Sequence, residues 1–252
     1  MMEPMPGNDP LTQTTLAAAT AELAARDPKL AAVVGRFGLP PLWDRPPGFG
    51  TLLHIVLEQQ VSLASARAAF ERLCAAAVPL TPATFLELTD PELLTIGFSR
   101  QKARYGRELA GALENGSLSL DDLARTDDET ARRALVTIPG IGPWTANIYL
   151  LMVLGRPDVW PVGDIALAAA VADVKGLDAR PDAAQLERLG EAWRPWRSVA
   201  ARLFWLDYLG RRGRQPASAE VAVAATTAAT SASAGPPRPS GSAPRRACRG
   251  RR

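Results

Sequence analysis

The stretch Leu135–Asp164 constrains this chain most, because two glycines and two prolines stand between apolar segments that are compatible with helices. The turn, IPGIGP over residues 138–143, ends one segment and begins the next. Glycine lets a backbone approach an outside group closely, and the first turn of a helix has unpaired N–H groups. The pattern predicts a helical hairpin over about residues 129–154 that binds a nucleic-acid phosphate, with Gly140, Gly142 and Thr145 as the contacts. An ordinary helix–turn–helix corner is the alternative.

The carbonyl groups of this turn form a second candidate site. Those of Val136, Ile138 and Ile141 are expected to face away from the amides and to bind a monovalent cation, Na⁺ or K⁺.

No cofactor is expected to be required. The chain has two cysteines, Cys74 and Cys248, and His54 is its only histidine. These numbers exclude a cysteine-held zinc or iron–sulfur site, a histidine-based metal site and a Ser-His-Asp triad within the chain.

Asp164 stands alone in an apolar context, after Trp160-Pro161-Val162-Gly163 and before an apolar helix. Aspartate is a preferred N-cap, so a capping role is one interpretation. The other is a functional carboxylate that stabilises a cation or activates a water molecule. The two are compatible, because a carboxylate at a helix start is expected to stay ionised.

The remaining segments predict an all-α fold, since no stretch shows sustained alternation with a period of two. Capping residues and prolines mark the starts of the expected helices. These cover about residues 14–26, 29–37, 49–58, 63–77, 99–113, 129–136, 145–154, 164–174, 182–193 and 195–211, with further starts at Thr81-Pro82 and Asp90-Pro91. We expect one helical domain over residues 11–213, between a disordered N-terminus (1–10) and a disordered Ala/Ser/Pro/Arg-rich tail (214–252).

The charge is unevenly distributed along the chain. Of the formal net charge of +3, nine arginines and one glutamate after residue 210 supply +8, which leaves −5 for residues 1–210. The folded part must therefore bind nucleic acid through a local patch and backbone amides rather than through its overall field. The basic tail either adds sequence-independent affinity for nucleic acid or is a dispensable extension.

No apolar run reaches the ~18 residues of a membrane span, and residues 1–10 lack an export pattern.

Several motifs together resemble the helix-hairpin-helix-GPD superfamily of base-excision DNA glycosylases. The string Leu135–Thr145 followed by Val159–Asp164 carries the likeness to the superfamily. LEQQVS (57–62), IGFSRQKA (96–103) and WRPWRSVA (193–200) are similar to its alkylation-repair branch, the DNA-3-methyladenine glycosylase II type. The likeness spans about Gly48 to Gly210. It implies a two-lobed helical fold, an active site in the cleft between the lobes, a flipped-out base and cleavage of the N-glycosidic bond.

The resemblance also implies roles for single residues. Asp164 matches the catalytic carboxylate, Trp144 and Trp205 match aromatics of the base pocket, and Gln60 matches the side chain that fills the gap left by the flipped base. Trp144 occupies the place where bifunctional relatives carry a Schiff-base lysine, so a monofunctional enzyme is expected. It would be a hydrolase acting in base excision repair on double-stranded DNA with alkylated purines, as a cytoplasmic, nucleoid-associated monomer without an iron–sulfur cluster.

Some residues depart from this pattern or leave alternatives open. The position four after Trp144, aromatic in some relatives, is Ile148. Two other functions remain: a helix-hairpin-helix glycosylase for oxidised or mismatched bases, which Trp144 in place of lysine disfavours, and a non-catalytic DNA-binding module in which Asp164 only caps a helix. Arg194 and Arg197 are expected to pair with acids or to cap the last helices rather than to touch DNA. The basic run of Arg100, Lys102, Arg104 and Arg107 either lines DNA or is a solvated face.

Overall fold

The computed structural model describes residues 9–213, and within this range it is helical without strands. The all-α prediction is confirmed. Most of the predicted disordered N-terminus and the predicted tail lie outside the described residues. The helices are α1 (Gln13–Arg26), α2 (Pro28–Phe37), α3 (Phe49–Glu58), α4 (Leu63–Ala76), α5 (Pro82–Glu87), α6 (Asp90–Ile96), α7 (Arg100–Glu114), α8 (Leu120–Arg125), α9 (Asp128–Val136), α10 (Pro143–Met152), α11 (Ile165–Lys175), α12 (Ala183–Gly190), the 3₁₀-helix η1 (Glu191–Trp193) and α13 (Arg197–Gly210).

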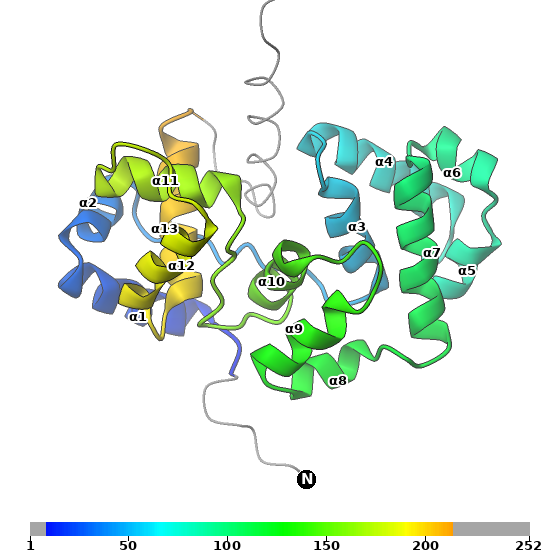
Figure 1. Ribbon diagram of the computed structural model, residues 1–252, viewed down its shortest axis with the longest axis horizontal. Helices are drawn as coiled ribbons and strands as arrows, with labels where there is room; N and C mark the ends of the chain where they lie inside the picture. Colours follow the sequence, from blue (N-terminus) through cyan, green and yellow to red (C-terminus); the bar gives the residue numbers. More distant parts are fainter. Residues whose placement is uncertain (1–8, 214–252) are drawn as a thin grey trace, which may run out of the picture.

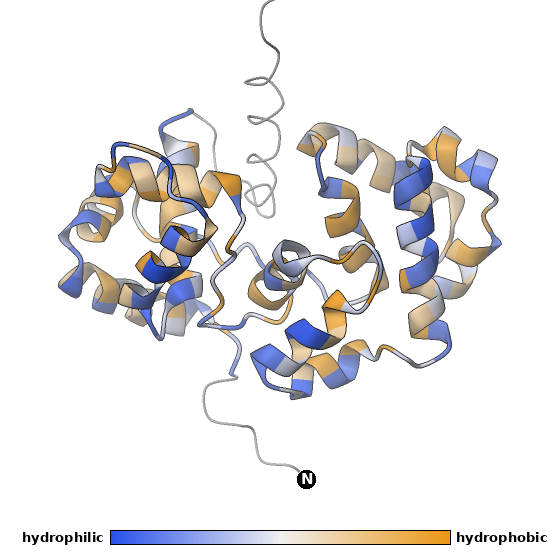
Figure 2. Ribbon diagram, viewed as in Figure 1, coloured by the Kyte–Doolittle hydropathy of each residue, from blue (hydrophilic) through white to orange (hydrophobic). Residues whose placement is uncertain are grey.

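The helices form two lobes, as predicted (Figure 1). In one lobe α13 packs against α11, α2 and α1, and η1 lies beside α12. In the other lobe α7 packs against α3, α5 and α6, and α10 packs against α3 and α9. The chain starts in the first lobe, crosses to the second through residues 38–48 and returns through residues 153–164. Figure 2 shows hydrophilic residues along α7 and α9, whose other faces are buried in the core.

Short polar side chains fix most helix starts. Asp27 caps α2, Ser62 caps α4 and Ser99 caps α7, all at predicted positions. The predicted start at Asp90 is displaced by one residue, because Thr89 forms the capping box with Glu92. The helix α8, which follows the Asn115-Gly116 turn and is capped by Ser119, is not among the predicted helices.

A buried arginine of α13 ties the first crossing and the last turn of α10 to its own helix. Arg202 is 1% exposed and donates hydrogen bonds to the carbonyls of Leu42 (2.8 Å), Leu151 (2.9 Å) and Ser198 (3.0 Å). Burial lowers the pKa of Arg202 to about 9, so it stays charged at neutral pH. Removing this side chain would leave three carbonyls without the partner that joins the lobes.

No helix within residues 9–213 combines the length and the apolar character that crossing a membrane requires.

Candidate active site

Asp164 caps α11 and receives hydrogen bonds from three directions. Its Oδ1 accepts from the backbone N–H of Leu167 at 2.7 Å and from Trp205 Nε1 at 3.3 Å. Its Oδ2 accepts from Trp144 Nε1 at 2.9 Å. The capping interpretation is therefore confirmed. The structure also brings the two predicted pocket tryptophans onto the predicted catalytic carboxylate.

Two opposing effects act on the protonation of this carboxylate. Asp164 is 1% exposed, and burial raises its pKa. The hydrogen bonds from Trp144, Leu167 and Trp205 lower the pKa again, but by less than burial raises it. Burial thus opposes the ionised form that the helix start favours, and the ionised carboxylate stays a prediction. All three partners are donors, however, and each favours the ionised form.

The site lies where the lobes meet. Trp144 belongs to α10 of one lobe, whereas Asp164 and Trp205 belong to the other, so the Trp144–Asp164 hydrogen bond crosses between them. Trp144 is half-buried, while Trp205 is fully buried beneath the carboxylate. Trp144 is therefore the indole that an incoming group can reach, whereas Trp205 holds the carboxylate from within the core.

A small cavity adjoins Asp164. Its volume is about 110 Å³, and its lining includes Gly163, Asp164, Ile165 and Arg180. Ligand pockets typically start at roughly 300 Å³, so a base cannot enter this space unless neighbouring groups move. The lining residues of this cavity all belong to the lobe of Asp164. Trp144 covers the carboxylate from the opposite lobe, so we expect its indole to be displaced when a ligand reaches the carboxylate from that side. Arg180 comes from the loop after α11, and no local sequence pattern indicates that it lies beside Asp164.

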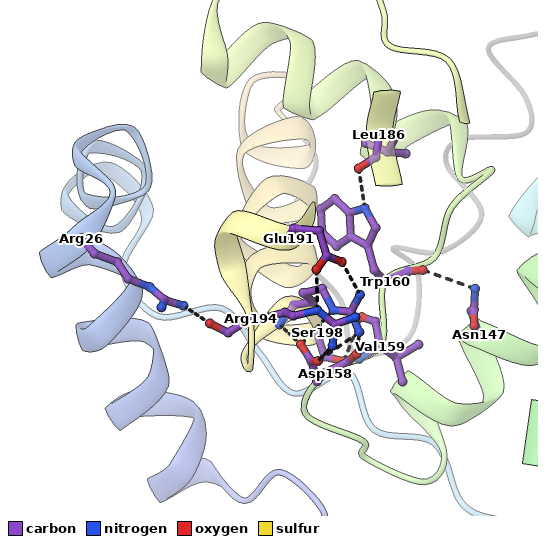
Figure 3. Close-up of polar contacts among 10 residues, drawn as sticks. Arg26, Asn147, Asp158, Val159, Trp160, Leu186, Glu191, Arg194 and Ser198 are labelled. Atoms are coloured by element: carbon purple, nitrogen blue, oxygen red, sulfur yellow. Dashed lines mark hydrogen bonds and ion pairs between the residues drawn. The ribbon is translucent and has the colours of Figure 1, made fainter. Parts of the chain in front are cut away.

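The segment that leads to Asp164 is firmly fixed (Figure 3). Trp160 donates its indole N–H to the Leu186 carbonyl at 2.9 Å, and its own carbonyl accepts from Asn147 Nδ2 at 3.3 Å. Ser198 Oγ holds the backbone N–H and carbonyl of Val159 at 2.9 and 3.1 Å. These contacts attach the segment before Asp164 to α10, α12 and α13, so all three helices hold the carboxylate in position.

Asp158 anchors the start of the same segment through two arginines. It pairs with Arg194 at 2.8 Å and with Arg197 at 2.9 Å, and Glu191 pairs with both as well. The prediction that these arginines pair with acids is confirmed. Arg194 also receives a hydrogen bond from Arg26 at its carbonyl, which links α1 to the site's support.

The predicted hairpin consists of α9, a tight turn and α10, which pack against each other. Gly142 is the N-cap of α10, and no side chain caps this helix, so the N–H groups of its first turn are available to an outside acceptor. A side chain at Gly142 would meet nothing within 4 Å. The backbone at Gly142 is thus open to approach, as the phosphate prediction requires.

Gly140 is glycine for a different reason. Its φ is +92°, and a Cβ at this position would come within 2.2 Å of the Tyr105 ring. Internal packing against α7 therefore demands glycine here, whether or not DNA approaches. The local pattern predicts an external contact for both glycines, because nothing in it shows that Tyr105 packs against Gly140.

The other predicted DNA contacts lie close to the hairpin. Gln60 is exposed, with a φ of +56° in the left-handed region. Thr145 is 1% exposed, and its hydroxyl accepts from Gln59 Nε2 at 2.9 Å. A contact from Thr145 to DNA would thus use its backbone N–H. Gln59 itself is a residue that the sequence analysis missed, although it stands in the Gln-Gln pair.

The turn carbonyls have mixed surroundings. The Ile138 carbonyl accepts from the Ile141 N–H at 3.0 Å, which closes the turn. The side chains of Ile138 and Ile141 are buried, and that of Val136 is 39% exposed. A monovalent cation at these three carbonyls stays a prediction.

Comparison with known proteins agrees with this geometry. Residues 53–195 match the family described as HhH-GPD superfamily base excision DNA repair protein. The chain is 31% identical over 166 residues to the putative DNA-3-methyladenine glycosylase YfjP of Bacillus subtilis, covering 62% of this chain and 58% of that protein. It therefore spans less than two thirds of that curated relative.

Two solved structures share the fold. The crystal structure of a DNA-3-methyladenine glycosidase from Bacillus halodurans superposes with a TM-score of 0.68 at 28% identity, over 77% of this chain and 91% of that one. The 3-methyladenine DNA glycosylase Mag1 of Schizosaccharomyces pombe, solved with abasic DNA, gives a TM-score of 0.66 at 23% identity, over 75% and 95%. With its lobes, its hairpin and its matched residues, the chain belongs to the HhH-GPD superfamily of base excision DNA repair proteins.

Proposed function

We propose that this protein is a monofunctional DNA glycosylase that excises alkylated purines of the 3-methyladenine type from double-stranded DNA. The observation that carries the proposal is the Asp164 carboxylate, held between the Trp144 and Trp205 indoles where the lobes meet. The names of the Bacillus relatives support the same substrate class. The protein would act as a cytoplasmic, nucleoid-associated monomer, with a monovalent cation at the hairpin.

DNA binding would start at the hairpin. The open first turn of α10 and the exposed backbone at Gly142 suit a phosphate group. The exposed Gln60 would enter the duplex and occupy the space of the flipped base. The base would then displace the Trp144 indole from Asp164 and stack on it, because an alkylated purine is cationic and a tryptophan face attracts cations.

Bond cleavage would need little from the protein. An N3- or N7-alkylated purine is already a good leaving group, so the C1′–N bond breaks as the bonding electrons leave with the base. The ionised Asp164 stabilises the positive charge on the sugar. Water then adds to C1′ and loses its proton. Trp144 has no nucleophilic amine, so no Schiff base forms and the strand stays intact.

Base release from four duplexes tests this proposal. The duplexes carry 3-methyladenine, hypoxanthine, 8-oxoguanine or uracil, and the protein is compared with Asp164→Asn. Asp173→Asn is the matched control, because Asp173 is an exposed residue of the same helix. We expect alkylpurine release without strand nicking, and at least ~100-fold slower release by Asp164→Asn. Tight DNA binding with no base released from any duplex would contradict the enzyme, and nicking would contradict the monofunctional mechanism.

A further inference from the structure

The loop that carries Gln60 is attached to the hairpin by its neighbour. Gln59 follows the last residue of α3, and its side-chain amide donates two hydrogen bonds across to the hairpin. Gln59 Nε2 lies 2.8 Å from the Gly140 carbonyl and 2.9 Å from Thr145 Oγ1. These acceptors stand on the two sides of the turn, one before Gly142 and one in the first turn of α10. A single side chain therefore bridges the turn and the Gln60 loop.

A lysine holds the same loop from the opposite side. Lys102 of α7 donates from Nζ to the carbonyl of Leu57 at 2.5 Å and to that of Gln59 at 2.8 Å. Between them, the Glu58 side chain is buried and forms two hydrogen bonds with Arg45. Lys102 thus points inward and caps α3, which decides against the interpretation that it lines DNA or belongs to a solvated face.

These attachments explain the backbone of Gln60. A φ of +56° is rarely adopted by a residue with a side chain, and it persists only where the surroundings impose it. Residues 57–59 are fixed by α7 and by the hairpin, so the chain must turn sharply at Gln60. The Gln60 side chain is consequently exposed beside the hairpin and is not buried in the lobe.

We propose that Gln59 is a positioning residue that couples phosphate binding at the hairpin to entry of Gln60 into the duplex. A phosphate that binds the first turn of α10 restrains the turn, and through Gln59 it restrains the Gln60 loop. The hairpin then binds the phosphate at the same step at which Gln60 fills the space that the flipped base leaves in the duplex. This inference rests on the proposed function, since it assigns Gln59 a part in base flipping.

A double-mutant cycle tests the coupling. Gln59→Leu keeps the volume of the side chain and removes both donors, and Gln60→Ala removes the wedge. Gln59→Glu is a second variant in case the first fails to fold, and Gln13→Ala is the control, because Gln13 is an exposed glutamine on α1. Single-turnover base release is measured with 3-methyladenine opposite thymine and with 3-methyladenine opposite an abasic site. No base pair has to be broken in the second duplex.

We expect Gln59→Leu to slow release about tenfold from the paired duplex and less than about threefold from the abasic one. We expect the double variant to release the base at about the same rate as Gln60→Ala alone, because the two residues act in one step. A merely structural role for Gln59 would slow both duplexes equally. Equal losses on the two duplexes, additive effects in the cycle or an unchanged rate would each overturn the inference.

A fluorescence measurement separates this inference from the proposed function. 2-Aminopurine brightens when it is unstacked, so a duplex that contains it reports flipping without any bond cleavage. If the unaltered protein released no base at all, the proposed function would fail, and the same cycle read by fluorescence would still decide on Gln59. Loss of the signal in Gln59→Leu and in Gln60→Ala, without further loss in the double variant, supports the coupling. Additive losses contradict it.

Discussion

Under the proposed function, the Asp164 carboxylate has one role in the fold and one in the chemistry, and the two roles make different demands on this residue. As the N-cap of α11, Asp164 needs only one oxygen to accept from Leu167. As a group that stabilises a sugar cation, it must carry a charge in a place where burial raises its pKa. Trp144 and Trp205 offset part of that cost by donating to the ionised form.

This conflict predicts opposite effects of two substitutions on stability. Asp164→Asn keeps an oxygen for Leu167 and removes the buried charge, so we expect the free energy of unfolding at pH 7 to stay equal or rise by up to about 1 kcal/mol. Asp164→Ala loses the cap, and we expect a loss of about 1 kcal/mol. Both variants lose base release. Denaturant unfolding of the three proteins measures the difference.

The pH dependence has a defined sign. A carboxyl group whose pKa is raised by folding binds its proton more tightly in the folded state, so its ionisation destabilises the fold above that pKa. As the pH falls through the raised pKa, the unaltered protein should therefore gain stability relative to Asp164→Asn, while its base release declines. A stability difference that stays constant between pH 7 and pH 4 would contradict the raised pKa of Asp164.

At the scale of elements, the hairpin shows which parts of a site a sequence can reveal. The positions of α9, the turn and α10 follow from local signals: an aspartate cap, glycine and proline in the turn, and apolar flanks. The pairing of Trp144 with Asp164 and the packing of Tyr105 against Gly140 depend on residues that are distant in sequence. No local pattern contains these two contacts, so the sequence could place the hairpin but could not show that Tyr105 requires a glycine at position 140.

The two glycines of the hairpin should therefore respond differently to alanine. Gly140→Ala places a Cβ against the Tyr105 ring at a positive φ, so we expect it to lower the free energy of unfolding by about 2 kcal/mol or more. Gly142→Ala, at φ −88° in open space, should change stability by less than about 0.5 kcal/mol and weaken DNA binding instead. Unfolding and DNA titration of both variants check this; equal destabilisation would refute the distinction.

At the scale of the whole molecule, charge and topology act separately. Residues 1–210 carry −5, so the hairpin has to attract a polyanion with backbone amides. Residues 214–252 contain seven arginines and one glutamate. This part of the chain is the main source of positive charge for long-range attraction.

Removal of residues 214–252 should therefore change binding and leave the chemistry intact. We expect a weaker association with DNA at low salt and a shallower dependence of the binding constant on salt concentration, because fewer counterions are released. Single-turnover base release at saturating protein should remain the same. Binding titrations between 50 and 300 mM salt, by fluorescence anisotropy at about neutral pH, measure the slope. An unchanged slope would identify the tail as a dispensable extension.

The path of the chain has a consequence for biosynthesis. The lobe of α3–α10 is inserted between α2 and α11, so α1 and α2 leave the ribosome long before α11 and α13, against which they pack. The inserted lobe is contiguous and can fold while synthesis continues, whereas the other must wait for its last helix. Asp164 and Trp205 both belong to the late lobe. A nascent or truncated chain would thus display a finished hairpin before the lobe that carries Asp164 and Trp205 can form.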